Sequence, residues 1–289
     1  MVNSISKKLV SSIIPERQEN SNKSTFGRVL NIAGSSFYPG AAFLSSISAL
    51  KTGCGYVSLA CIKSLIPVIA SMVPEITYIP LKENRLGSID SDNEIKQLLT
   101  FNVVSLGCGI TTNDSTKSFI LNLLPKISDR QKLIIDADGI NILAMHKGEI
   151  NLKDAVITPH PKELSRLLNV SVAEINDNRE KYARITSQTY ECITVLKGKN
   201  TIVTNGDKIY INQTGNSALA KAGTGDVLTG IIAGLLAQKV SSLNAAVAGV
   251  YLHGLAGDIA SKDLSEYSVM ASNIIDYIPF AIRETTIKE

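Results

Sequence analysis

The chain has 289 residues, of which 44% are hydrophobic, so it can bury one large core and in principle could hold two domains. Its 29 basic and 26 acidic residues give a formal net charge of +3 and form no block of like charge, which argues against a nucleic-acid partner. The longest apolar run, 227–237, is shorter than the roughly 20 residues of a membrane span, so we expect no membrane partner.

Residues 1–25 form a polar segment without the apolar stretch of a signal peptide. The cysteines are scattered without a CxxC pair, and no histidine lies at a spacing that would complete a zinc site. We therefore expect a cytoplasmic protein with reduced, mostly buried thiols. Residues 26–289 show no linker, repeat or low-complexity stretch, which favours a single domain.

Apolar, β-rich runs alternate with helical patterns along this region. The predicted strands are 27–33, 55–60, 103–106, 132–136, 155–158, 192–197, 201–205 and 208–211. The predicted helices are 41–51, 62–72, 93–99, 116–124, 138–145, 161–168, 172–190, 226–237, 242–264 and 268–283. The alternation predicts an α/β fold with a mostly parallel sheet, and Gly206-Asp207 predicts a late antiparallel hairpin.

Ligands of open parallel sheets bind beyond the carboxyl ends of the strands, so the segments that follow strands are the first candidates for a site. In the segment AGSSFYPGAA (33–42), Gly34 and Gly40 permit close backbone approach, and the helix start offers amide donors to an anion. The segment lacks the dinucleotide spacing GxGxxG, so a plain turn is an equal alternative.

Two further strand ends carry small or acidic residues. GCGITTND (107–114) allows a tight turn in which Asp114 caps the next helix, although a simple loop explains it equally well. In DADGIN (136–141), Asp136 and Asp138 should point to opposite sides. Capping accounts for Asp138, whereas Asp136 could serve magnesium or phosphate through water.

The segment TPHPKE (158–163) fixes the backbone around His160 by prolines on both sides, with Pro161 at the first helical position and Glu163 in the first turn. This stiffness favours a ligand contact for His160 over a purely structural role. The basic turn LKGKNT (196–201) could bind phosphate or ribose, or be an ordinary hairpin. His253 lies on an apolar helix, which favours a structural role.

The strongest candidate is NSALAKAGTGD (216–226), which runs into an apolar helix. Gly223 and Gly225 can present backbone amides to phosphate oxygens, and the positive end of the helix stabilises charge that develops during phosphoryl transfer. Asp226 is placed to accept a proton from an attacking hydroxyl. The alternative is that Asp226 merely caps the helix.

Taken in this order, the glycine turn, GxG turn, DADxxN, TPHPxE, LKG and GTGD segments resemble those of the carbohydrate-kinase-related family of ADP- or ATP-dependent NAD(P)H-hydrate dehydratases, in the ribokinase-like superfamily. The resemblance runs from about Phe26 to Pro279. It implies a three-layer αβα sandwich of the ribokinase-like type. It also implies an enzyme that repairs hydrated NADH or NADPH: a phosphoryl group from ADP or ATP moves to the ring hydroxyl, and loss of phosphate restores the double bond.

The resemblance also implies roles for individual residues. Asp226 would be the general base, with Gly223, Thr224 and Gly225 as the anion hole. The hydrated cofactor would contact Asp226 and a further set of residues: Ala42, Gly109, His160, Pro161, Lys162, Glu163, Leu164, Ser165 and Arg166. The adenine nucleotide would contact Lys197, Gly198, Lys199, Asn200, Thr201, Asn216, Lys221 and Gly225. Mg²⁺ would bridge the nucleotide phosphates, with no protein ligand assigned directly.

The chain departs from the family pattern at a few positions. The family commonly has a proline inside the glycine turn, where Cys108 and Ile110 flank Gly109, and Ala222 and Gly139 stand where glycine and alanine are usual. Many relatives carry an N-terminal epimerase domain, for which residues 1–25 leave no room, so epimerisation would come from a separate protein or occur spontaneously. The small-residue helices near the C-terminus and the resemblance both favour a homotetramer.

Two other functions remain open. A small-molecule kinase of the same fold, of the hydroxyethylthiazole or pyridoxal type, would use the same glycine loop and aspartate, although TPHPxE and LKG argue against it. A nucleotide-binding regulator without turnover is the third possibility. Between donors, the stand-alone chain resembles the ADP-using microbial members more closely.

Overall fold

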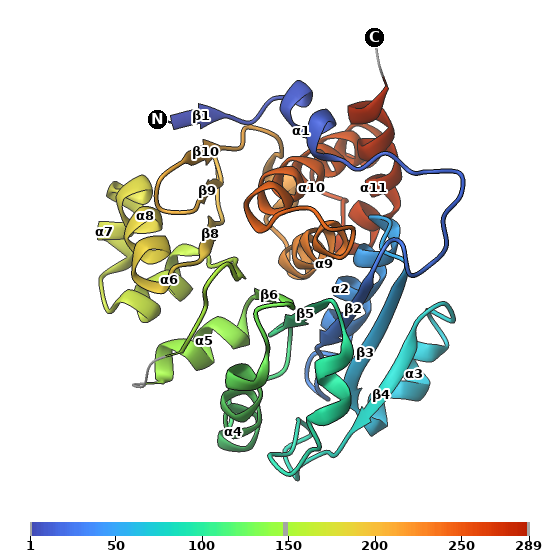
Figure 1. Cartoon of the computed structure of the whole chain (residues 1–289). Coiled ribbons are helices and arrows are strands. Elements are labelled where there is room, and N and C mark those ends of the chain that lie inside the picture. The colour runs from blue at the N-terminus through green and yellow to red at the C-terminus, as the bar shows by residue number, and fades with distance from the viewer. Residues whose placement is uncertain (1, 147–149, 288–289) are drawn as a thin grey trace.

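A computed structural model describes residues 2–146 and 150–287. Within this range the chain forms a ten-stranded sheet in the order β1-β10-β9-β8-β7-β6-β5-β2-β3-β4 (Figure 1). The strands are β1 (Val2–Ser4), β2 (Arg28–Ile32), β3 (Tyr56–Ile62), β4 (Thr77–Leu81), β5 (Val103–Leu106), β6 (Lys132–Ile135), β7 (Val156–Ile157), β8 (Ile193–Leu196), β9 (Ile202–Thr204) and β10 (Ile209–Ile211). All neighbours pair in parallel except β9, which is antiparallel to β8 and to β10, so the predicted late hairpin is confirmed.

Helices cover both faces of this sheet. They are α1 (Lys7–Ile13), α2 (Pro39–Lys51), α3 (Ile66–Ala70), α4 (Asp114–Leu123), α5 (Asp138–Met145), α6 (Pro161–Leu168), α7 (Val172–Asp177), α8 (Arg179–Tyr190), α9 (Thr224–Ala237), α10 (Ser242–Leu264) and α11 (Ala271–Thr286), with short 3-10 turns at Lys63–Leu65, Lys96–Thr100, Leu124–Lys126 and Ser217–Leu219. Helices α2, α9 and α10 pack together on one face, whereas α4, α5 and α8 lie on the other (Figure 1). The predicted three-layer arrangement is therefore confirmed.

The central strands are buried on both faces, as their continuous apolar sequences predict. All four residues of β5 are buried, and Leu133, Ile134 and Ile135 of β6 are buried beside them. Such β-branched and aliphatic side chains suit a parallel sheet covered by helices. The four cysteines are free and buried, as expected.

Small residues bring α9 close to its neighbours. A Cβ on Gly230 would lie 2.3 Å from the Ser45 carbonyl oxygen of α2, and one on Gly249 would lie 2.5 Å from Ile232. Helix α9 therefore packs closely against α2, α10 and the sheet, and its N-terminus lies at the edge of the sheet where the strands end. These small residues pack within the chain, so they give no support to a tetramer, which now rests on the family resemblance alone.

The structure corrects several predicted elements. Residues 1–25 are not merely a polar segment, because they contain β1, which pairs with β10, and helix α1. Strand β4 was not predicted, since Pro80 and its partly exposed edge weaken the strand pattern. The helix predicted at 172–190 breaks at Asn178, whose φ of −138° and ψ of 50° are not helical. The helix predicted at 62–72 is a 3-10 turn at Lys63–Leu65 followed by the five-residue helix α3, and the one predicted at 93–99 is a 3-10 turn at Lys96–Thr100.

The strand order reverses between β2 and β5, because β3 and β4 extend the sheet one way and β6, β7 and β8 the other. Such a reversal opens a crevice beyond the carboxyl ends of the strands, where ligands bind in open α/β sheets. The glycine turns and the Asp136, His160 and Lys197 segments all follow strands that end at this edge. None of the helices in the described ranges combines the length and hydropathy needed to cross a bilayer.

Candidate active site

A buried ion pair joins two strand ends at the centre of this edge. The Lys197 ammonium, after β8, donates to Asp136 Oδ1 at 2.7 Å, and the Thr229 hydroxyl of α9 donates to Asp136 Oδ2 at 2.8 Å. Glu163 Oε2 of α6 lies 3.9 Å from the same ammonium. Burial acts to lower the pKa of Lys197, but the neighbouring Asp136 and Glu163 carboxylates raise it overall, so the ammonium stays charged.

Helix α9 begins with the GTGD segment, next to the ion pair of Lys197 and Asp136. Gly223 has a φ of 89° and occupies the N-cap position without a side-chain cap bond, and Asp226 is the third helical residue. The alternative that Asp226 merely caps the helix is therefore wrong. Gly225 faces the ion pair, because a Cβ built there would lie 3.5 Å from Lys197 Nζ and 3.7 Å from Asp136 Oδ2. The start of α9 and the Lys197 ammonium thus converge on one small space suited to an anion.

The Asp226 carboxyl group is poised to exchange a proton near neutral pH. Burial raises its pKa to about 6 and the Asp136 carboxylate adds to this, whereas interaction with the Cys108 thiol and the Lys197 charge oppose the rise. A general base works best when its pKa lies close to the operating pH. Such a carboxylate at a helix N-terminus, beside an anion-binding space, can accept a proton from a hydroxyl group.

Cys108, Asp136 and Asp226 each offer one ligand atom, and these atoms lie within 4.8 Å of one another. The set does not suit Mg²⁺, which prefers oxygen ligands in octahedral geometry. One member is a soft thiol, both Asp136 oxygens already accept hydrogen bonds, and a lysine cation lies beside them. We therefore assign no metal to these residues.

His160 acts as the cap of α6. Its Nδ1 accepts from the backbone N–H groups of Lys162 and Glu163 at 3.1 and 3.2 Å, and Glu163 Oε2 accepts from the His160 N–H at 2.8 Å, which completes a reciprocal capping box. Burial lowers the pKa of His160, and the Lys197 charge lowers it further, so the ring is neutral at neutral pH. The flanking prolines thus serve a structural role, while His160 also lines the cavity described below.

Two expected capping roles were wrong by one residue. Asn113, not Asp114, caps α4 by accepting from the Thr116 N–H. Asp138 lies in the first turn of α5 rather than at its cap, and its carboxylate accepts from the Thr111 N–H at 2.8 Å. Asp138 therefore fastens the loop after β5 to the DADGIN segment.

Apart from Asp226, the residues expected to bind the hydrated cofactor come from three segments at the same edge. Gly109 has a φ of 66°, and a Cβ there would clash with Tyr38 at 2.6 Å, so the GCG turn lies against the start of α2. Arg166 donates to Asn141 at 2.8 Å and ties α6 to α5. Ala42 and Leu164 are fully buried, so their side chains support this surface from behind rather than face it. Pro161, Lys162 and Ser165 lie at the exposed start of α6.

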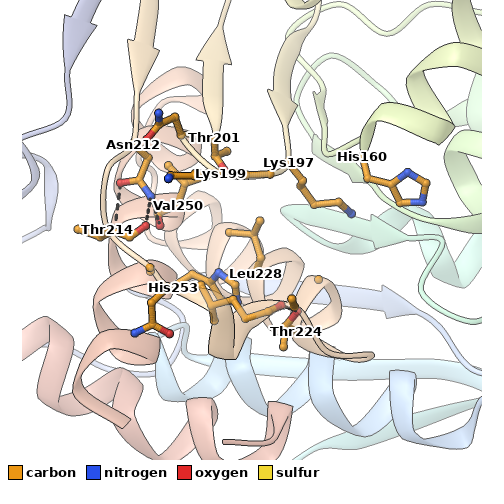
Figure 2. A pocket seen from close by; sticks show the side chains of 18 of the residues that line it. His160, Lys197, Lys199, Thr201, Asn212, Thr214, Thr224, Leu228, Val250 and His253 are labelled. Atoms are coloured by element: carbon orange, nitrogen blue, oxygen red, sulfur yellow. Dashed lines mark hydrogen bonds between the residues drawn. The ribbon is translucent and has the colours of Figure 1, made fainter. Parts of the chain in front are cut away.

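A cavity of about 970 Å³ opens beside the GTGD segment, and Figure 2 shows side chains that line it. Every residue expected to contact nucleotide lies on its wall: Lys197, Gly198, Lys199, Asn200, Thr201, Asn216, Lys221 and Gly225. His160, Pro161 and Thr224 line it as well. The basic turn and the anion loop thus share one cavity large enough for a nucleotide.

Two of these expected contacts are engaged elsewhere. The Asn216 amide donates to Asp258 and Ser261 and accepts from the Ala218 N–H, so it holds the loop in shape. The Lys221 ammonium donates to the carbonyl oxygens of Tyr267 and Val269. These hydrogen bonds fix the loop that precedes GTGD.

The cavity also includes residues that sequence reasoning missed. They are the NQTG segment 212–215 after β10, Leu228 of α9, and Val250, His253 and Gly254 of α10. His253 is 8% exposed, and its Nε2 has no hydrogen-bond partner in the described part of the chain. Burial lowers its pKa to about 4, so the ring is neutral. The one available signal was Gly215, a glycine immediately upstream of the strongest motif.

The chain matches known proteins along most of its length. A model of the NAD(P)H-hydrate dehydratase family matches residues 29–280. The chain is 32% identical to the ADP-dependent (S)-NAD(P)H-hydrate dehydratase of Bacillus subtilis, covering 93% of this chain and 94% of the relative, and 35% identical to that of Neisseria meningitidis, covering 86% and 82%. It is 34% identical to the bifunctional NAD(P)H-hydrate repair enzyme of Moorella thermoacetica, of which it spans about half the length, 52%.

Solved structures give the same result. The ADP/ATP-dependent NAD(P)H-hydrate dehydratase of Bacillus subtilis, co-crystallised with ATP/Mg²⁺, superposes with a TM-score of 0.87 at 30% identity, covering 98% of this chain and 99% of the other. A hydroxyethylthiazole kinase from Pyrococcus horikoshii gives a TM-score of 0.59 at 13% identity, a likeness of fold alone. The chain belongs to the NAD(P)H-hydrate dehydratase family.

Proposed function

We propose that this chain is an ADP-dependent (S)-NAD(P)H-hydrate dehydratase, which repairs hydrated NADH and NADPH. The observation that carries the proposal is the position of Asp226: a carboxyl group with a pKa raised to about 6, at the start of α9, between the GCG turn and the space that faces Lys197. The named relatives supply the substrate, which the geometry alone does not specify.

In the proposed reaction, the ring hydroxyl of the hydrated cofactor gives its proton to Asp226 while its oxygen attacks the terminal phosphorus of the nucleotide. The bond from that phosphorus to the leaving nucleotide oxygen breaks. The backbone amide at Gly225 and the Lys197 ammonium stabilise the negative charge on the transferring group, whereas the Thr224 N–H donates to the Lys221 carbonyl oxygen. The carbon–oxygen bond of the phosphorylated ring then breaks, a proton leaves the adjacent carbon, and the double bond returns as phosphate departs.

Mg²⁺ would enter bound to the nucleotide phosphates and neutralise part of their charge. The Bacillus subtilis relative was co-crystallised with ATP/Mg²⁺. Because Cys108, Asp136 and Asp226 do not suit this ion, we propose no direct protein ligand for it. We also propose a homotetramer and supply of the S isomer by a separate epimerase or by spontaneous epimerisation; light scattering of the purified chain tests the first.

The competing function is a small-molecule kinase. The fold of the Pyrococcus horikoshii kinase is similar, but a kinase would release a stable phosphorylated product. Incubation with hydrated NADH and ADP separates the two functions. The proposal expects regenerated NADH together with free phosphate, whereas a kinase would leave a phosphorylated acceptor and no NADH.

The pH dependence of the reaction should follow Asp226. Its pKa is raised from 3.8 to about 6 in the folded chain, so the base is protonated and inactive below that pH and ionised above it. We expect kcat/KM to rise with pH through about pH 6 and then to level off. A pH–rate profile of the wild-type chain, with stability checked at each pH, measures this. A profile that is flat through this region would contradict the assignment of Asp226 as base.

Replacement of Gly225 by Ala should separate folding from phosphoryl transfer. The new methyl group would meet only Lys197 Nζ and Asp136 Oδ2, at ordinary contact distances, and alanine favours a helix over glycine by roughly 0.5–1 kcal/mol. The melting temperature should therefore stay equal or rise. Activity should fall by about tenfold or more, because the methyl group occupies the space of the transferring phosphoryl group.

The matched control for this change is Gly40→Ala in the first turn of α2, where an added Cβ meets nothing within 4 Å. It should leave phosphoryl transfer intact. Full activity of Gly225→Ala would argue against the proposed position of the phosphoryl group.

Replacement of His160 by Ala should weaken both a helix cap and a binding surface. Loss of the cap is expected to lower the free energy of unfolding by about 1 kcal/mol. Because His160 also lines the cavity, KM should rise by several-fold. Ser171→Ala removes the equivalent capping box of α7 and should cause a similar loss of stability without a change in KM. Equal kinetic effects of the two changes would show that His160 acts only as a cap.

A further inference from the structure

Cys108 lies next to Asp226, the proposed catalytic base. It follows β5 and is 1% exposed, and its Sγ lies within 4.8 Å of a carboxylate oxygen of Asp226 and of one from Asp136. Gly107, with a φ of 123°, allows the turn to come this close, because a Cβ there would lie 1.9 Å from the Asp136 carbonyl oxygen. The Gly34 N–H donates to the Cys108 carbonyl at 2.9 Å and fixes the backbone.

The Asp226 carboxylate has few other partners. Both oxygens of the adjacent Asp136 are satisfied by Lys197 and Thr229, but across residues 2–146 and 150–287 no N–H or O–H group donates a hydrogen bond to Asp226. The Cys108 Sγ lies within 4.8 Å of an Asp226 carboxylate oxygen, and its interaction with the carboxyl group acts to lower the pKa of Asp226. Burial first, and then the Asp226 and Asp136 charges, raise the pKa of the thiol, so the sulfur keeps its proton and can act as a donor.

Other charged groups surround Asp226 without holding it. Asp136 approaches from the end of β6, Asp138 from α5 and Lys197 from the end of β8. Glu163 and His160, at the start of α6, lie close to Lys197. These groups change the electrostatic potential at Asp226, whereas a hydrogen bond from a fixed donor also fixes the direction of the carboxylate.

We propose that Cys108 is a positioning residue for the base: its S–H group donates to the Asp226 carboxylate and orients the free oxygen toward the acceptor hydroxyl. The role rests on the proposed function of Asp226. The proline that the family pattern commonly has inside the glycine turn carries no side-chain donor.

The kinetic test compares the wild-type chain with Cys108→Ala and Cys108→Ser. Loss of the donor should move the acidic limb of the kcat/KM profile to higher pH by about half a unit to one unit, since a thiol is a weak donor but its acceptor is charged. Activity should therefore fall several-fold at acidic pH and recover at alkaline pH. Serine, which keeps a donor, should return the limb to the wild-type position or below. Nucleotide affinity should stay unchanged in both variants.

A spectroscopic test decides the hydrogen bond even if the chain shows no dehydratase activity. The S–H stretching band of Cys108 is isolated as the Raman difference between wild type and Cys108→Ser. It should lie at lower frequency than a free thiol and move to higher frequency in Asp226→Ala. An unmoved band, or an acidic limb that is the same in all three proteins, would overturn the positioning role. Absent turnover in the wild type, with the band shift intact, would count against the proposed function alone.

Discussion

Replacement of Asp226 by Asn is expected to lower kcat/KM by about a hundredfold or more, because it removes the group that accepts the hydroxyl proton and leaves the shape of the site intact. The effect should appear in kcat at saturating substrate, with a nucleotide dissociation constant close to that of the wild type. Steady-state kinetics and calorimetric titration of the nucleotide measure the two quantities.

The same change should not destabilise the chain. The folded chain raises the Asp226 pKa from 3.8 to about 6, so this group favours folding while protonated and loses that contribution as the pH rises through about 6. At neutral pH the ionised carboxylate is therefore unfavourable, and asparagine should raise the free energy of unfolding by about 1–3 kcal/mol. The difference should vanish at acidic pH. Denaturant titrations at two pH values measure it.

Asp114→Asn is the matched control, since Asp114 also lies in the first turn of a helix but is exposed and pairs with Lys117. It should leave both kcat/KM and the free energy of unfolding close to their wild-type values, because an exposed ion pair contributes little to stability. Retention of more than about a tenth of the activity by Asp226→Asn would mean that another group accepts the proton.

Replacement of Lys197 by Met is expected to have the largest effect on stability. It leaves the buried Asp136 carboxylate without its 2.7 Å partner and Glu163 without its nearest cation. An uncompensated buried charge of this kind destabilises by about 3–5 kcal/mol, and the 20% exposure of the lysine side chain favours the lower value. Activity should fall as well, by about a hundredfold, because the cation beside the transferring phosphoryl group is lost. Denaturant unfolding and kinetics under stabilising conditions measure the two effects.

The double variant Lys197→Met with Asp136→Asn separates these effects. Removal of both charges should restore most of the lost stability, since an asparagine can still accept the Thr229 hydrogen bond. Activity should stay low. A double variant as unstable as the single one would place the loss in packing rather than in charge, and restored activity would remove Lys197 from the mechanism.

Sequence patterns predicted most of what local interactions determine. The mostly apolar run 103–106 gave strand β5 at its observed bounds, and the glycines before Asp226 predicted the start of helix α9 to within two residues. The capping predictions for Asp114 and Asp138 were one residue off. Asn113 and Asp114 are adjacent polar residues, and only the loop geometry decides which of them caps α4, whereas the N-cap position of α5 is Ala137, which has no side-chain cap.

The interactions that organise the site join residues that are far apart in the sequence, so local sequence patterns do not predict them. Asp136 and Lys197 are 61 residues apart and meet only because β6 and β8 flank β7 in the sheet. The NQTG segment and His253 reach the cavity by a similar long-range juxtaposition. Strand β1 was invisible for the same reason, since its three residues become a strand only beside β10, more than 200 residues later.

The most direct test of the account is turnover by the purified wild-type chain with (S)-hydrated NADH, ADP and Mg²⁺. We predict recovery of the absorbance of the reduced nicotinamide ring, with release of one phosphate for each NADH formed, and loss of both signals in Asp226→Asn. Failure to regenerate NADH with either ADP or ATP, in a chain that binds the nucleotide, would contradict the proposed function.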